Sequence, residues 1–91
     1  MKISKSAGAG SMESNDAMIL VEPGDGEIEI MIESVVKKQF GAQIEKAVRD
    51  VLEAFEVNDA RVLVRDKGAV ECTLKARMET AILRARGEEN I

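Results

Sequence analysis

The stretch "EIEIMIE", residues 27–33, decides the fold because its side chains alternate between apolar and polar with the period of a β-strand. Ile28, Ile30 and Ile32 fall on one side, whereas three glutamates and Met31 fall on the other. We therefore expect one face of this strand to be buried against a core and the other to meet solvent.

Two further strands are predicted around this one. The run "AMILVE" (17–22) ends at the turn cluster "PGDG" (23–26), a pattern that predicts an antiparallel hairpin with residues 27–33. Alternation returns in "ARVLVRD" (60–66), which predicts a third strand. Its inward side chains are Ala60, Val62 and Val64, and its outward ones are Arg61 and Arg65.

Two helices are predicted from apolar side chains that recur every three or four residues. The first is expected over about 35–56 with Ser34 as its cap, and the second runs from Asp66 as N-cap to about Arg86, with Gly87 in the C-cap position. The apolar positions of the first are Val36, Phe40, Ile44, Ala47, Val48, Val51, Leu52 and Phe55. Those of the second are Val70, Leu74, Met78, Ala81, Ile82 and Ala85.

These elements predict the α+β class: a two-layer sandwich in β-β-α-β-α order, with a small, mostly antiparallel sheet and two helices on one face. We expect strand 17–22 to lie between the other two strands. The segment "AVECTLK", at the start of the second helix, also fits a strand. Residues 1–16 are short of large apolar side chains and are expected to form a flexible arm. The predicted division is thus an arm (1–16), one domain (17–87) and a C-terminal tail (88–91).

Composition limits the function. A chain of 91 residues makes one domain and buries only about 60–65% of its unfolded surface, which leaves little interior for a deep active site. The net charge of −4 argues against nucleic acid as a partner. One cysteine and no histidine argue against a disulfide or a metal site. With neither a secretory signal nor a membrane span predicted, we expect a cytoplasmic protein.

Two surface features have structural interpretations. Cys72 shares a second, narrower apolar stripe of the second helix with Ala69, Ala76 and Leu83, and we interpret it as a packed structural thiol. A partner-facing thiol and a reactive thiol are the alternatives. Carboxylates gather along the first two strands, which we interpret as a solvated strand face. They are Glu22, Asp25, Glu27, Glu29 and Glu33.

No constellation of catalytic residues can be recognised in the sequence, which has no histidine and whose carboxylates are expected on solvent-exposed faces. General acid–base chemistry at neutral pH usually uses histidine, and a nucleophilic serine or cysteine needs an adjacent base. Gly8 and Gly10 fit a phosphate-binding loop poorly, because a strand follows and no lysine stands after them, and a flexible arm is the plainer interpretation. Ser11 and Ser14 are expected to be exposed in the Gly/Ala-rich arm, where a serine is open to covalent modification. The chain is therefore expected to bind or carry rather than to catalyse.

Four segments resemble the acyl carrier protein of citrate lyase, its gamma subunit, in the same order and over nearly the full length. They are "AGSMESNDAM" (9–18), "VKKQFG" (36–41), "DKGAVEC" (66–72) and "KARMETAILRA" (75–85). Members of that family are modified on a serine within a Gly-(Ser/Thr)-x-Glu-Ser-x-Asp motif. The motif corresponds here to Gly10, Ser11, Glu13, Ser14 and Asp16. The resemblance therefore implies that Ser14 is the attachment site, with Ser11 as the alternative.

The resemblance also implies a cofactor and partners. The family's serine carries phosphoribosyl-dephospho-CoA through a phosphodiester, attached by a prosthetic-group transferase. The thiol of that group presents acetyl and citryl thioesters to the alpha (acyl transferase) and beta (citryl lyase) subunits, which cleave citrate to oxaloacetate and acetate. A carrier of malonate decarboxylase or of citramalate lyase is a close alternative. A non-catalytic assembly or regulatory module is the alternative from another class.

Overall fold

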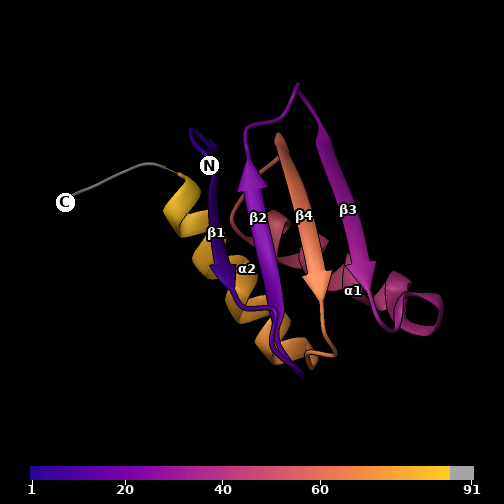
Figure 1. Cartoon of the computed structure of the whole chain (residues 1–91). Coiled ribbons are helices and arrows are strands. Elements are labelled where there is room, and N and C mark those ends of the chain that lie inside the picture. The colour runs from indigo at the N-terminus through magenta and orange to yellow at the C-terminus, as the bar shows by residue number, and fades with distance from the viewer. Residues whose placement is uncertain (87–91) are drawn as a thin grey trace.

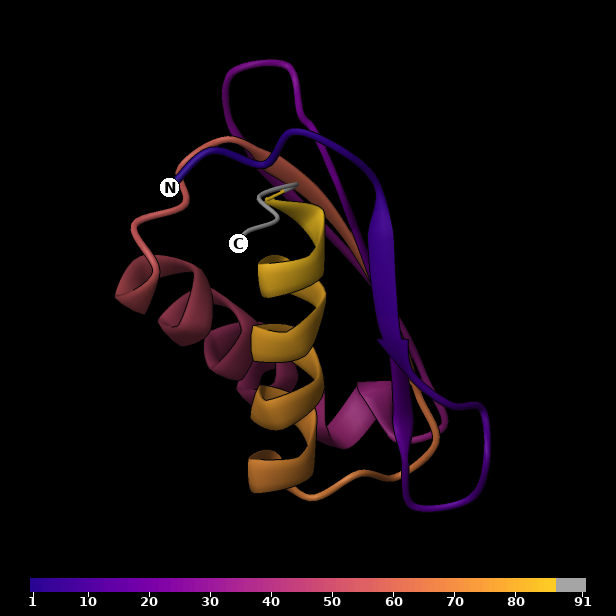
Figure 2. The same ribbon diagram turned by 90° about the vertical axis from the view of Figure 1, so that its left-hand side faces the viewer.

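The structure is a computed structural model that describes residues 1–86 as two layers, a four-stranded sheet and a pair of helices (Figure 1). Both helices cover the same face of the sheet and leave the other face open (Figure 2). Two of the three strand pairings are antiparallel, which confirms the predicted α+β sandwich with a mostly antiparallel sheet. The elements are β1 (Ala7–Gly10), β2 (Ala17–Glu22), β3 (Ile28–Ser34), α1 (Lys37–Ala54), β4 (Ala60–Asp66) and α2 (Glu71–Ala85).

The strand order β1-β2-β4-β3 differs from the predicted one. β2 and β3 do not form a hairpin, because β4 lies between them, antiparallel to β2 and parallel to β3. The segment 23–27 instead passes over the start of β4, where the Gly26 amide donates to Asp59 Oδ1 (2.9 Å) and the Ala60 amide to the Glu27 carbonyl (3.2 Å). The inward side chains of β4 are almost completely buried, whereas those of β3 are half-buried. The position of β4 between β2 and β3 accounts for this burial, since β3 is an edge strand of the sheet.

Part of the expected flexible arm packs against the domain: residues 7–10 form a strand of the sheet, and Ile3 is buried in the core. β1 is an edge strand paired with β2 from Ala7 opposite Val21 to Gly10 opposite Met18. Before it, Ile3 is only 3% exposed, and the amides of residues 4 and 5 both donate to the carbonyl at the end of α2. Contact with α2 thus compensates for the weak strand propensity of glycine and alanine. Within the expected arm, β1 covers only residues 7–10, and residues 11–16 form the loop to β2. The predicted tail (88–91) and C-cap Gly87 lie outside the described residues.

Both predicted capping residues hold loops instead of helix ends. The helices begin after Val36 and Val70, neither of which caps with its side chain. Ser34 Oγ accepts the Val36 amide (3.0 Å) and donates to Asp66 Oδ2 (2.7 Å), while Asp66 Oδ1 accepts the Ala69 amide (2.9 Å). Each of these side chains therefore ties the end of a strand to the loop that follows it.

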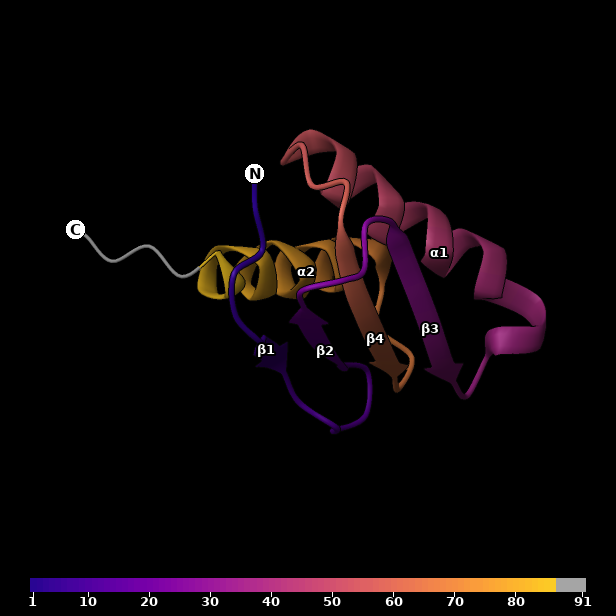
Figure 3. The same cartoon turned by 90° about the horizontal axis from the view of Figure 1, so that it is seen from above.

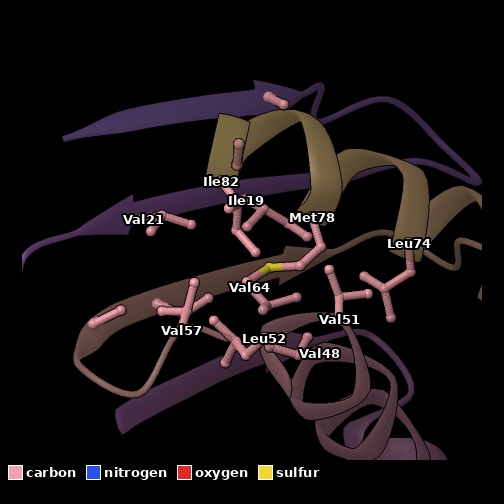
Figure 4. Packing of buried hydrophobic residues seen from close by; sticks show 14 of the residues in the cluster. Ile19, Val21, Val48, Val51, Leu52, Val57, Val64, Leu74, Met78 and Ile82 are labelled. Carbon is pink, nitrogen blue, oxygen red and sulfur yellow. The ribbon is translucent and has the colours of Figure 1, made fainter. Parts of the chain in front are cut away.

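The core lies between the helices and the inward face of the sheet, as Figure 4 shows. α1 packs against β3, α2 packs against β1 and β2, and the two helices contact each other (Figure 3). Met78 is fully buried among side chains from both layers. Most of the predicted inward positions are buried, but Val70 is 63% exposed and Phe40 is also exposed, because both stand at the first turn of their helix or just before it. The largest fully buried side chains are Ile19, Met78, Ile82, Val21, Val48, Val62 and Val64.

Because Met78 fills the space between the layers, Met78→Ala is expected to lower the free energy of unfolding by about 2–5 kcal/mol. Urea unfolding followed by circular dichroism measures this loss. Met31→Ala is the matched control: that side chain is 63% exposed on the open face, and its loss is expected to change stability by less than about 0.5 kcal/mol. Equal losses in the two variants would contradict the assignment of inward and outward faces.

Candidate functional site

Residues 11–16 join β1 to β2 at the end of the sheet where β3 and β4 also end (Figure 1). We call this segment the Ser14 loop. Seen with the sheet edge-on, the Ser14 loop bends away from the helices, toward the open face of the sheet (Figure 2). The loop is therefore clear of the core and accessible from the side that no helix covers.

The backbone of the Ser14 loop depends on two residues with positive φ. Gly10 has φ 100°, and a Cβ atom at this position would collide with the Ala17 carbonyl oxygen, so only glycine fits. Asn15 has φ 67° and is the third residue of a turn closed by a hydrogen bond from the Asp16 amide to the Glu13 carbonyl (3.1 Å). Asparagine is one of the few residues that tolerate this conformation. Ser14 is the second residue of this turn and lies at the tip of the loop.

An ion pair fixes the base of the loop. Arg77 of α2 donates from Nε to Asp16 Oδ1 (2.9 Å) and from Nη2 to Asp16 Oδ2 (3.0 Å), the bidentate geometry that arginine forms with a carboxylate. The same carboxylate accepts the Ser11 hydroxyl (2.7 Å) and the Ala17 amide (2.7 Å). Hydrogen bonds from Arg77, Ser11 and Ala17 hold the pKa of Asp16 well below its usual range. Asp16 therefore stays ionised at neutral pH and holds the base of the loop to α2.

The loop between β4 and α2 supports the Ser14 loop from a second side. The Asn15 amide donates to the Lys67 carbonyl (2.8 Å), and the Lys67 amide donates to the Asp16 carbonyl (2.9 Å). This pair of backbone bonds extends the β2–β4 pairing into the loop. The expected mobile segment is thus anchored at its base, whereas its tip stays exposed.

The two serines of the motif differ in their surroundings. Ser11 is half-buried, donates its hydroxyl to Asp16 and accepts the Glu13 amide (3.3 Å). Ser14 is exposed, and within residues 1–86 its hydroxyl has no hydrogen-bond partner. Ser11 thus has a structural role in the loop, and Ser14 has the hydroxyl that an external reagent can reach.

The site lacks an activating base. The Asp16 carboxylate is occupied by Arg77 and Ser11, and Glu13 is exposed on the loop surface. Among the described residues, no group of three His, Cys, Asp or Glu side chains is arranged to hold a metal ion, and no helix is long and apolar enough to cross a membrane. The arrangement suits a serine that is modified by another protein, since nucleophilic catalysis would need a base beside the hydroxyl.

Cys72 is not the packed thiol that its position on the helix predicted. It is exposed in the first turn of α2, and Ala76 and Leu83 of the same predicted stripe are also exposed. Only Ala69 of that stripe packs against the core. The stripe lies on the outer surface of α2, so no strand of the described chain covers it.

Arg77 is the functional residue that the sequence analysis missed. It stands 61 residues from Asp16, and neither its helical position nor its neighbours single it out from the other basic residues of α2. A contact between residues so far apart is visible only once the strand order brings the Ser14 loop to the side of α2.

Comparisons with known proteins show that the chain is similar to acyl carrier proteins in sequence and to a malonate decarboxylase chain in fold. A model of the acyl carrier family described as malonate decarboxylase delta subunit (MdcD) matches residues 4–85. The citrate lyase acyl carrier protein of Enterobacter sp. is 47% identical over 100% of this chain and 94% of its own length. That of Haemophilus influenzae is 50% identical over 97% and 92%. A chain in the crystal structure of a Pseudomonas malonate decarboxylase hetero-tetramer in complex with malonate has the same fold, with a TM-score of 0.80, 19% identity and coverage of 91% and 86%.

Replacing the anchoring carboxylate, Asp16→Asn, is expected to destabilise the protein at pH 7. The pKa of Asp16 is lower in the folded protein than in the unfolded chain, where it is about 3.9. The ionised Asp16 side chain therefore stabilises the fold fully at a pH above about 3.9, and this stabilisation is lost as the pH falls below that value. Thermal unfolding of the wild-type chain and of Asp16→Asn between pH 7 and pH 2 measures this effect. We expect the difference in Tm between the two proteins to become smaller as the pH approaches 2. Glu13→Gln, at an exposed carboxylate of the same loop, is the control and is expected to leave Tm nearly unchanged. A difference that stays constant with pH would contradict the ion pair.

Proposed function

The chain belongs to the citrate lyase acyl carrier protein family, and we propose that it carries its acyl group on a prosthetic group attached to the Ser14 hydroxyl. It is a non-catalytic carrier subunit. Gly10, Ser11, Glu13 and Asp16 form the flanking motif of the proposed attachment site.

One observation carries the choice of Ser14. Its hydroxyl is exposed and without a partner in the described chain, at the tip of a loop whose base is fixed by Asp16 and Arg77. A transferase that modifies this serine meets a preformed turn and does not have to order a flexible segment, which would cost conformational entropy. Ser11 is less suitable, because its modification would break its hydrogen bonds to Asp16 and Glu13.

The surroundings of Ser14 fit a large anionic group joined by a phosphodiester, and we propose phosphoribosyl-dephospho-CoA. Such a group supplies a terminal thiol that holds the acyl residue as a thioester. Ser14 and Asn15 are both exposed, so a large substituent has room outside the fold. The nearby Asp16 carboxylate is neutralised by Arg77, so it repels a phosphate less than an unpaired carboxylate would.

The proposed partners are the acyl transferase (alpha) and citryl lyase (beta) subunits of a cytoplasmic citrate lyase, together with the transferase that attaches the group. A tethered thioester reaches two active sites at a high effective concentration, provided that its point of attachment is held in a defined place. The anchored base and exposed tip of the Ser14 loop meet this requirement.

A second candidate is a carrier of malonate decarboxylase. The family model and the fold shared with a chain of the Pseudomonas hetero-tetramer favour it, although that chain is only 19% identical. The near 50% identity to citrate lyase carriers favours the first candidate.

Ser14→Ala is expected to abolish attachment while leaving the free energy of unfolding within about 0.5 kcal/mol of wild type, because the side chain makes no contact with the core. Intact mass and peptide mapping of the chain, purified with its native partners, check this result. Ser11→Ala is the matched control, one turn away in the same loop: it is expected to keep the added mass but to lower Tm. Attachment that survives Ser14→Ala and fails in Ser11→Ala would move the site to Ser11, and a bare wild-type chain in an active complex would support an assembly module instead.

A further inference from the structure

The open face of the sheet carries an apolar row where an uncovered face normally carries polar side chains. The strand register places Leu20 of β2 beside Leu63 of β4, and Leu63 beside Met31 of β3. Leu20 is 44% exposed, Met31 is 63% exposed and Leu63 is half-buried. We call these three residues the apolar row. It crosses three neighbouring strands, so it is a continuous surface and not a set of scattered exposed side chains.

Ion pairs border the apolar row on both sides. Arg61 binds Glu29 (3.0 Å) and Asp25 (2.9 Å) on one side, and Arg65 binds Glu33 (3.2 Å) on the other. Glu22 lies opposite Arg61 in the register. Four carboxylates and two guanidinium groups give this border a net charge of −2. The acidic strand face, interpreted from the sequence as solvated, is thus the polar rim of an apolar centre, the arrangement typical of a protein interface.

The apolar row and the Ser14 loop lie on the same side of the molecule. The loop bends toward the open face, as Figure 2 shows, and Met12 on it is exposed. A shallow groove of about 140 Å³ lies between Met12 and the ends of β3 and β4, with Val35 and Arg65 among its lining residues. The surface is therefore continuous from the apolar row to the loop that bears Ser14.

We propose that another subunit of the lyase docks on the open face of the sheet, with apolar side chains against the apolar row and basic side chains against its acidic border. This inference rests on the proposed carrier function, since a carrier must bring Ser14 to a partner. A second copy of this chain is a poorer occupant, because two borders of charge −2 would repel each other. Docking here places the Ser14 loop at the rim of the interface, where an attached group reaches the partner without being buried by the contact itself.

Methionine methyl groups provide a direct test on the wild-type fold. Met18 and Met31 lie on the open face, whereas Met78 is buried in the core and Met1 lies near Glu56, beyond the end of α1. With ¹³C-methyl methionine in the carrier, addition of each purified partner subunit in turn is expected to shift or broaden Met18 and Met31 and to leave Met1 and Met78 unchanged. Shifts at Met1 alone, or at none of the four with either subunit while the assembled complex forms, would overturn the proposal.

Two charge-introducing variants compare the two faces of the molecule. Met31→Glu places a charge in the apolar row, and Leu83→Glu makes the same kind of change at an exposed apolar side chain of α2. We expect Met31→Glu to weaken binding of the partner by about tenfold or more, with an unchanged circular dichroism spectrum, and Leu83→Glu to bind as wild type. Rising ionic strength is expected to weaken binding of the wild-type chain, because the acidic border is screened. If both variants bind the partner equally well, the proposal is wrong. It is also wrong if the isolated wild-type chain forms a homodimer and Met31→Glu makes that dimer dissociate.

Ser14→Ala separates this proposal from the proposed function. That variant is expected to shift the same methyl groups as the wild-type chain when a partner is added, because docking depends on the sheet and not on the attached group. If the Ser14→Ala chain docks normally and the complex that contains it is still active, only the attachment site is refuted. If Ser14→Ala loses the attached group while Met31→Glu still binds the partner normally, the attachment site stands and only the docking face is refuted.

Discussion

The bidentate ion pair between Asp16 and Arg77 is the contact on which the geometry of the Ser14 loop depends. It joins the loop to α2, and the same carboxylate holds the Ser11 hydroxyl and the Ala17 amide at the start of β2. One side chain thus connects both ends of the loop and the helix layer. The ionised carboxylate accepts hydrogen bonds from Arg77, Ser11 and Ala17 at the same time, and these charge-assisted bonds help a six-residue loop to keep a defined shape.

The position of β4 explains the rest of the architecture. As the partner of both β2 and β3, it aligns their outward residues, so that Leu20, Leu63 and Met31 become neighbours although they are far apart in the sequence. The hairpin predicted between β2 and β3 would have brought Leu20 and Met31 to adjacent strands without Leu63 between them. The same central strand ends at Asp66, whose buried carboxylate binds Ser34 and the Ala69 amide and so holds the neighbouring loops at the end of the sheet that carries Ser14.

Alternation and helical spacing in the sequence predicted which face of each element is buried, since these periods depend only on local geometry. They did not predict the strand order, because an alternating strand pairs equally well with several neighbours. They also missed β1, since Ala7 and Gly8 owe their strand conformation to contacts with β2 and α2 and not to their own propensity. For the site, the motif pointed to Ser14 and its flanking residues, but no local pattern distinguishes the engaged hydroxyl of Ser11 from the free one of Ser14, or reveals Arg77.

The helix layer and the sheet layer have different roles in this small carrier. The helix layer, with its apolar core and Arg77, stabilises the fold and anchors the Ser14 loop from behind. Within residues 1–86, nothing covers the outer face of the sheet, so this face remains available to a partner on the side toward which the loop bends. A domain of this size has little interior. Its fold instead holds Ser14 in a defined position beside an open sheet face, so that the proposed attachment site and the proposed docking face are neighbouring but separate.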